Sequence, residues 1–160
     1  MKNFYLITLF MCLSNLQAWA TGSSEKAVYD LIERVTPGYA SQYRLEIIPS
    51  ENGNDVYEVD GDGQKIILRG NNAVSLATAF NWYLKYTCHA HVSWFGNQLE
   101  LPAKLPQPAH KERRIINGKY RVYMNYCTVS YTAAWWNWER WQQELDYMAM
   151  NAINMPLFSV

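Results

Sequence analysis

The sequence has no excess of either charge, because its 160 residues contain 14 Lys and Arg against 14 Asp and Glu. A protein that attracts nucleic acid or an anionic membrane surface through its overall field carries a large positive charge. We therefore expect neither nucleic acid nor a charged membrane surface as a partner.

Cysteine is scarce, with three residues in the whole chain, and the glycosylation sequon Asn-x-Ser/Thr is absent. Cys12 lies in an apolar N-terminal run, which leaves Cys88 and Cys127 as the only pair that could form a disulfide in an oxidising compartment. The sequence leaves open whether they do. No Asn-linked glycan is expected on the chain.

Long hydrophobic runs are also missing. The N-terminal run Phe4–Leu13 is shorter than the roughly 18 apolar residues that mark a membrane-spanning helix. Lys2 precedes this run and the small-x-small sequence Ala18-Trp19-Ala20 follows it, in the order of a secretory signal peptide. We predict a signal peptide over residues 1–20, cleavage after Ala20, and a secreted or periplasmic mature protein outside the membrane.

Residues 21–110 show the patterns of a small α+β domain. Apolar residues at helical spacing after Ser23 or Ser24 predict a first helix that Pro37-Gly38 ends. Asn72 is the expected cap of a second helix, and three prolines in the segment that follows predict an extended linker. The expected elements are the strands Tyr43–Ile48, Val56–Val59 and Lys65–Arg69, the helix Ala73–Tyr86 and the linker Leu99–His110.

Residues 111–160 predict one strand–helix–strand unit. The strand Tyr120–Cys127 alternates in direction, and the face that carries Asn125 becomes polar towards the C-terminal end. Ala152–Leu157 is the expected second strand, parallel to the first. Between the strands, one apolar stripe recurs at helical spacing. It consists of Trp138, Trp141, Leu145, Met148 and Ala152.

A polar C-terminal end is typical of the first strand of a (β/α)8 barrel, because these barrels carry their chemistry at that end of the strands. A closed barrel takes about 250 residues, so only its beginning fits here. We expect an α+β domain followed by the start of a truncated TIM barrel, in the N-terminal part of a longer protein.

Two runs carry a resemblance to a known family. The run Asn125–Trp141, N-Y-C-T-V-S-Y-T-A-A-W-W-N-W-E-R-W, has clustered tryptophans after a Cys-Thr-x-Ser-Tyr turn, and His91–Pro102 reads H-V-S-W-F-G-N-Q-L-E-L-P. Both resemble glycoside hydrolase family 89, the α-N-acetylglucosaminidases. The sequence departs from the family at Ala152, where the family usually has glycine, and at Phe158–Val160.

The resemblance implies an exported exo-glycosidase that hydrolyses terminal α-linked N-acetylglucosamine from glycans, with retention of configuration and without metal or cofactor. In the family the two catalytic glutamates lie on later strands, beyond residue 160 of this chain. The 160 residues alone are therefore expected to be inactive, and no catalytic residue is assigned among them. The alternative is a non-catalytic carbohydrate-binding or structural module that is complete at this length.

Three residues are candidates for substrate binding, namely Asn125, Cys127 and Tyr131. Asn125 and Cys127 share the polar face at the end of the predicted strand, and Tyr131 lies in the turn that follows. In the family, residues of the first strand line the N-acetylglucosamine subsite. The resemblance thus implies that Asn125 bonds sugar hydroxyls, that Tyr131 walls the pocket, and that Cys127 is a free thiol with a small, weakly polar surface.

Two short motifs could bind a metal. The carboxylates of Asp60–Gly63 suit calcium, but a calcium loop needs further spaced ligands and a closing Glu, and an Asp-Gly step between strands is typical of a hairpin turn. Cys88, His89 and His91 could bind zinc, but no fourth ligand is spaced nearby. We expect no metal, and for the second motif a structural role at the junction with the barrel.

The remaining tryptophans and carboxylates of the predicted helix are assigned to structure. Trp135, Trp138 and Trp141 lie on or beside the apolar stripe and are expected in the core, whereas Trp136 lies off the stripe and could bind sugar or pack. Glu139 and Glu144 are expected on solvated faces. Asp146 adjoins the stripe and is expected to anchor the helix.

Overall fold

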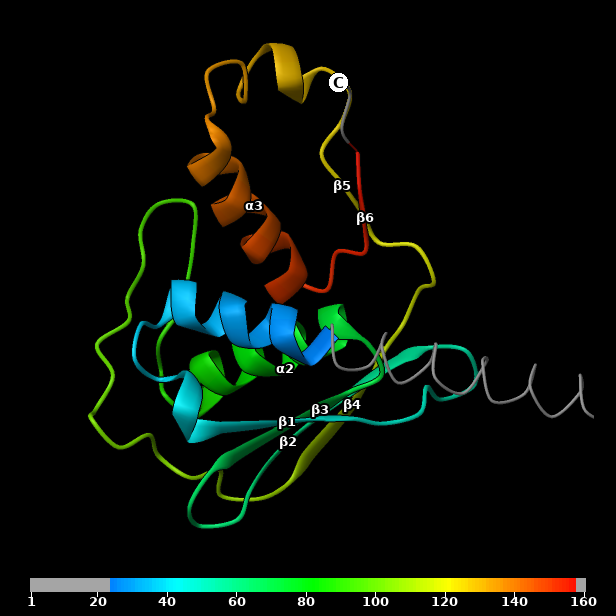
Figure 1. The fold of residues 1–160 in the computed structure, drawn as a ribbon. Helices are drawn as coiled ribbons and strands as arrows, with labels where there is room; N and C mark the ends of the chain where they lie inside the picture. Colours follow the sequence, from blue (N-terminus) through cyan, green and yellow to red (C-terminus); the bar gives the residue numbers. More distant parts are fainter. Residues whose placement is uncertain (1–23, 158–160) are drawn as a thin grey trace, which may run out of the picture.

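The computed structural model describes residues 24–157. It contains a four-stranded sheet covered on one face by two helices, and a strand–helix–strand unit that rests on those helices (Figure 1). None of the helices within residues 24–157 is long and apolar enough to cross a membrane. The signal peptide predicted over residues 1–20 lies outside the described part of the chain.

The three strands predicted in the first domain are confirmed. The strand order is β1-β3-β2-β4, with β1 parallel to β3 and β2 antiparallel to both β3 and β4. A short 3-10 helix, η1 (Ala40–Gln42), leads into β1. The four strands are β1 (Tyr43–Ile47), β2 (Asp55–Gly61), β3 (Ile66–Gly70) and β4 (Glu112–Ile116).

The first sheet extends past residue 110, where the sequence analysis placed the domain boundary. β4 pairs along β2, with Val59 opposite Glu112 and Asp55 opposite Ile116. The sequence Glu-Arg-Arg-Ile-Ile shows no clear alternation, so this strand was not predicted. β4 is the edge strand of the sheet next to β2, and we therefore place the end of the first domain after Ile116.

The two helices of the first domain form as the sequence predicts. The helix over residues 24–35 is followed by a turn in which Gly38 takes a φ of 83°, in the region that favours glycine. α2 (Ala73–Tyr86) begins at Asn72, whose side chain accepts a 2.9 Å hydrogen bond from the Ser75 amide. α2 packs so closely on β3 that a Cβ at Gly70 would lie 2.7 Å from the Leu76 nitrogen.

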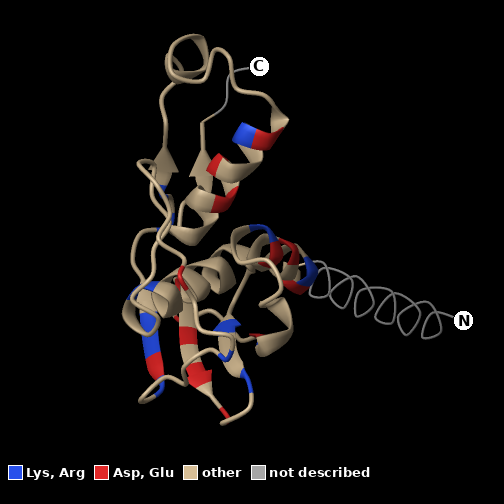
Figure 2. Cartoon of the chain, turned by 90° about the vertical axis from the view of Figure 1, so that its left-hand side faces the viewer, with Lys and Arg blue, Asp and Glu red and all other residues tan. Residues whose placement is uncertain are grey.

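The core lies between these helices and one face of the sheet. Tyr43 of β1 packs edge-on against Phe80 and Tyr83 of α2, with ring centroids 5.5 and 5.7 Å apart. The opposite face of the sheet is charged, and Lys and Arg lie beside Asp and Glu on the strands (Figure 2). There Arg69 contacts Glu46, Asp60 and Glu58. One face of the sheet therefore packs in the hydrophobic core, and the other carries charged side chains.

The segment Leu99–His110 lacks regular secondary structure, but it is not a free linker. Leu105 is 2% exposed and belongs to the core. Tyr83 donates a 2.8 Å hydrogen bond to the Pro106 carbonyl, and the Leu105 amide donates one of 2.9 Å to Gln42. The segment is irregular, as expected of the Pro-containing linker that ends the first domain, but it packs against the core of that domain along its length.

The run Asp60–Gly63 forms the hairpin turn that the sequence predicts. The Asp62 carboxylate accepts hydrogen bonds from the amides of Gln64 and Lys65 at 2.9 and 2.7 Å. Gly63 adopts a φ of 85°. β2 and β3 pair antiparallel on either side of this turn.

The C-terminal unit has the parallel pairing that the sequence predicts. β5 (Val122–Tyr123) runs parallel to β6 (Met155–Pro156), and α3 (Trp138–Met150) connects them. Both strands are shorter than expected from the sequence. β5 ends where Met124 takes a φ of 69°, which turns the chain out of the strand.

The C-terminal end of α3 is seated on the first domain, against α2 (Figure 1). Met148 and Met150 are buried there, at 2% and 1% exposure. Asn81 of α2 donates a 2.8 Å hydrogen bond to the carbonyl of Met150, at the last turn of α3. The first domain therefore fixes the direction in which α3 leaves it.

Candidate functional site

The segment after β5 folds back on itself around one asparagine. The Asn125 Oδ1 accepts hydrogen bonds from the amides of Cys127 and Thr128 at 3.0 and 3.2 Å, and from the Thr128 hydroxyl at 3.3 Å. These bonds lead into a 3-10 helix, η2 (Thr128–Ser130). An Asn side chain that bonds the backbone two and three residues ahead is a typical turn former. Residues 124–131 are called the β5 loop below.

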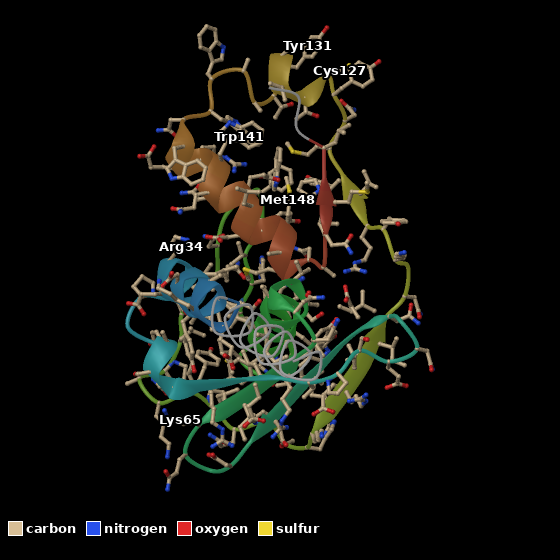
Figure 3. The ribbon with its side chains drawn as sticks, turned by 45° about the vertical axis from the view of Figure 1, so that its right-hand side comes forward. Arg34, Lys65, Cys127, Tyr131, Trp141 and Met148 are labelled. Carbon is tan, nitrogen blue, oxygen red and sulfur yellow. The ribbon has the colours of Figure 1, made fainter. Side chains whose placement is uncertain are left out.

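The structure brings the three predicted binding residues together in the β5 loop. Asn125 and Cys127 are exposed, and the Tyr131 side chain is 77% exposed. Cys127 and Tyr131 lie at the end of the unit that is remote from the four-stranded sheet (Figure 3). The expectation that Asn125 and Cys127 lie on the strand itself is wrong, because β5 ends at Tyr123.

Asn125 keeps one polar group available for a ligand. Its oxygen is taken up by the turn, whereas its Nδ2 group has no hydrogen-bond partner within residues 24–157. An amide nitrogen is a donor, and sugar hydroxyls and ring oxygens accept. Asn125 can therefore act here as a donor only.

Exposed aromatic rings lie in the β5 loop and in the segment that follows it in sequence. Tyr126 and Trp135 are 73% and 95% exposed, and Trp138 at the start of α3 is 64% exposed. The assignment of Trp135 and Trp138 to the core is wrong, because α3 begins only at Trp138 and its first turn projects beyond the first domain. Tyr126 was missed as a candidate, although it stands between Asn125 and Cys127 in the quoted motif.

Trp136, left open by the sequence, packs rather than projecting freely. Its ring lies 4.9 Å from that of Trp141 and 6.0 Å from that of Trp94, centroid to centroid. The Arg140 guanidinium lies 3.9 Å from the centre of the Trp136 ring. This arrangement is a cation–π contact backed by two further indoles.

Glu144 belongs to the same cluster and is buried, at 1% exposure. Its carboxylate accepts a 2.8 Å hydrogen bond from Arg140 and one of 3.2 Å from the Trp94 indole. The expectation of a solvated Glu144 is wrong, since a buried carboxylate persists where a cation and a donor neutralise it. Glu139 is exposed, as expected.

Asp146 anchors α3, as predicted. The Arg34 guanidinium donates to both of its oxygens at 2.7 Å, and the contact raises the pKa of Arg34. A cavity of about 430 Å³ lies beside this pair, between the helix over residues 24–35, the segment 92–97 and α3. Four of the charged side chains that line it form two ion pairs, Arg34 with Asp146 and Arg140 with Glu144, while Glu139 makes no ion pair within residues 24–157. No residue of the β5 loop lines this cavity.

The two cysteines of the described chain are free thiols. Cys88 is half-buried against the core, and burial raises its pKa. Cys127 is exposed in the β5 loop. Within residues 24–157 no three His, Cys, Asp or Glu side chains are grouped so that they could hold a metal ion.

Two family descriptions match the chain. Residues 26–107 match the N-terminal domain of alpha-N-acetylglucosaminidase (NAGLU), and residues 121–160 match its TIM-barrel domain. The human alpha-N-acetylglucosaminidase is 37% identical over 136 residues, which cover 82% of this chain and 18% of the human protein.

Solved structures of a family 89 glycoside hydrolase from Clostridium perfringens have the same fold. The complex with 2-acetamido-1,2-dideoxynojirmycin superposes with a TM-score of 0.87 at 31% identity, over 96% of this chain and 18% of that one. A variant with two glutamates changed to glutamine, bound to its substrate GlcNAc-alpha-1,4-galactose, gives a TM-score of 0.86 at 32% identity, over 95% and 18%.

An α+β domain that leads into the first strand–helix–strand unit of a TIM barrel, with sequence matches across both parts, defines the class as glycoside hydrolase. The chain belongs to glycoside hydrolase family 89, the α-N-acetylglucosaminidases. It spans about a fifth of the length of these relatives.

Proposed function

We propose that this chain is the N-terminal part of an exo-glycosidase that removes terminal α-linked N-acetylglucosamine from glycans. The match that runs through both the accessory domain and the start of the barrel carries the proposal. The bacterial relative supports the substrate class, because it was solved with GlcNAc-alpha-1,4-galactose. In a (β/α)8 enzyme the substrate lies at the C-terminal ends of the strands, where the β5 loop is found.

Within this enzyme the β5 loop forms one wall of the N-acetylglucosamine subsite. Asn125 donates from Nδ2 to a sugar oxygen, while its own oxygen holds the loop in shape. Tyr131 offers an exposed ring to the sugar, and Cys127 contributes a small surface between them. These roles need rigid placement more than reactivity, and the Asn125 turn supplies it.

The catalytic carboxylates lie beyond residue 160. Hydrolysis with retention needs a nucleophile and an acid/base whose carboxyl groups are about 5 Å apart. Glu144 is neutralised by Arg140, and Glu139 projects from α3 into solvent, so neither belongs to such a pair. The two glutamates replaced in the substrate complex of the relative support a pair of glutamates in this role.

We also propose that the enzyme is exported through a signal peptide cleaved after Ala20. The order of Lys2, an apolar run and Ala18-Trp19-Ala20 supports export. Sequencing the mature N-terminus tests this directly, with Thr21 as the expected first residue. A mature protein that still begins at Met1 would refute cleavage.

The test of the catalytic proposal is the stereochemistry of the complete protein on an aryl α-N-acetylglucosaminide. Retention predicts that proton NMR detects the α-anomer of N-acetylglucosamine first, before mutarotation. Release of the β-anomer first, or no hydrolysis, would overturn the proposal. Residues 21–160 alone are expected to give no turnover, and turnover abolished by Glu139→Gln or Glu144→Gln would place the chemistry in this chain instead.

A further inference from the structure

One arginine connects the accessory domain to the first barrel strand. Arg121 stands directly before β5, and its side chain is only 13% exposed. Its Nη2 binds the carboxylate of Asp55, its Nη1 donates to the Gly118 carbonyl at 2.7 Å, and its Nε donates to the Ala152 carbonyl. Each of the three guanidinium nitrogens is thus hydrogen-bonded, and each binds a different segment of the chain.

The acceptor on the first domain is itself held in place. Asp55 opens β2, and its other oxygen accepts hydrogen bonds from Asn71 and Asn72 at 2.9 and 2.7 Å. Burial raises the pKa of Asp55, but the bonds from Asn71, Arg121 and Asn72 and the charge of Arg121 outweigh burial and lower it. Asn72 also caps α2. Arg121 therefore binds a fixed point rather than a mobile surface carboxylate.

The acceptor in the barrel unit lies at the turn between α3 and β6. Ala152 has a φ of 64°, and the backbone of Arg121 pairs with the residues that follow, because its amide donates to Asn154 at 2.9 Å and its carbonyl accepts from Met155 at 3.2 Å. Arg121 thus binds the entrance of β6 through both side chain and main chain.

This position matters because β5 and β6 are only two residues long in the described chain. So short a ladder defines the register of the strands weakly, and a slip of one residue would turn every side chain to the other face. Only residues 122–124 separate Arg121 from Asn125, so a displacement at Arg121 is carried into the β5 loop. The contacts of Arg121 with residues 152–155 fix the register of β5 against β6, which the short ladder alone defines weakly.

We propose that Arg121, bound to Asp55, is a positioning residue that sets the place of the β5 loop, and with it the sugar subsite, relative to the accessory domain. The catalytic consequence rests on the proposed function, but the placement of the loop does not. The accessory domain then acts on catalysis by fixing one wall of the pocket without touching the substrate.

The test compares Arg121→Lys with Arg34→Lys in the complete protein. Each change keeps the positive charge but removes a guanidinium whose hydrogen bonds connect the first domain to the barrel unit. The two differ in place, because Arg34 binds Asp146 on α3, whereas Arg121 stands directly before β5. A displacement near 1 Å can cost about 100-fold in rate, so we expect kcat/KM to fall roughly 10- to 100-fold in Arg121→Lys. The inhibition constant of free N-acetylglucosamine should rise as well. Asp55→Asn, which keeps an acceptor for Arg121, should give an intermediate loss.

A second readout does not depend on activity. Cys127 reports on the β5 loop, so its alkylation rate, followed by peptide mass mapping, should change severalfold in Arg121→Lys and stay at the wild-type value in Arg34→Lys. If both variants lose thermal stability alike and neither changes the alkylation of Cys127, positioning by Arg121 is refuted. If the wild-type protein lacks glycosidase activity, the proposed function fails, and the alkylation rates still decide the placement of the loop.

Discussion

The Arg34 guanidinium donates two hydrogen bonds of 2.7 Å to the carboxylate of Asp146, across 112 residues of sequence. A planar guanidinium that meets both oxygens of a carboxylate makes the strong form of an ion pair. The Asp146 side chain is 11% exposed, while that of Arg34 is 37% exposed, so solvent screens the pair in part. The pair joins the first helix of the accessory domain to the helix of the barrel unit.

Removing this pair should loosen α3. We expect Asp146→Asn in residues 21–160 to lower the free energy of unfolding by about 1–2 kcal/mol. The substitution removes the charge of the carboxylate that Arg34 binds, and solvent already screens this pair in part. Urea denaturation measures the change. Asp30→Asn is the control, because the Lys26–Asp30 pair has the same kind of carboxylate on an exposed helix surface. A loss in the control as large as in Asp146→Asn would contradict the anchoring role.

Acid should weaken the first domain through Glu58. Burial raises the pKa of Glu58, but hydrogen bonds from Lys111 and Arg113 and their charges outweigh burial and hold the pKa below its ordinary value. A carboxyl with a lowered pKa contributes stability that is complete above its unfolded pKa, about 4.3, and is lost as the pH falls through the folded value. Stability should therefore decline below about pH 4.3.

The variant Glu58→Gln separates this contribution from the rest. It should be less stable than the wild type at neutral pH and lose stability less steeply between pH 5 and pH 3, by urea denaturation at each pH. Glu139→Gln removes one carboxylate that makes no ion pair within the described residues and serves as the control for the change in charge. An acid slope of Glu58→Gln equal to that of the wild type would show that the cations around Glu58 do not act as described.

The first domain was predictable where one segment decides its own burial. The bounds Ala73–Tyr86 of α2 were expected from an Asn cap and an apolar helix, and the structure has them. β4 could not be predicted in this way. Its Arg113 reads as a surface charge in an irregular segment until Glu58 on the neighbouring strand is known as its partner.

The candidate site was predictable in its location but not in its geometry. The motif placed Asn125, Cys127 and Tyr131 at the end of the first barrel strand, yet β5 stops earlier because Met124 has a positive φ, which a methionine does not signal in sequence. Burial of Glu144 was missed for a related reason. It depends on Trp94, which comes from another part of the chain.

The backbone at Ala152 has a conformation that suits glycine, the residue that the family resemblance implies there. Ala152 has a φ of 64°, which is unfavourable for a residue with a Cβ. Ala152→Gly should raise the free energy of unfolding of residues 21–160 by about 0.5–1 kcal/mol, measured by urea denaturation. The matched control is Ala27→Gly on the exposed side of the helix over residues 24–35, which should lower it by about 1 kcal/mol. A loss in both variants would mean that the turn at Ala152 carries no strain.

The two polar atoms of Asn125 allow its binding role to be separated from its structural role. Asn125→Asp keeps an oxygen for the amides of Cys127 and Thr128 and replaces the Nδ2 donor by a charged carboxylate oxygen, whereas Asn125→Ala removes both the oxygen and the donor. If Nδ2 binds the sugar, both variants of the complete protein should lose about 1–3 kcal/mol of transition-state stabilisation in kcat/KM. Asn125→Ala should also change the alkylation rate of Cys127 by releasing the turn, whereas Asn125→Asp should lower that rate only through the added negative charge near the thiol.

The control for this comparison is Asn97→Ala. Asn97 also accepts a hydrogen bond from a backbone amide, that of Ser93, but in the segment 92–97 beside the cavity. Its loss should leave kcat/KM near the wild-type value. Unchanged kinetics of Asn125→Asp at both low and saturating substrate would show that Nδ2 does not contact the sugar. Asn125 would then serve only to shape the β5 loop, and any hydrogen bonds to the substrate from this wall would have to come from other residues of the loop.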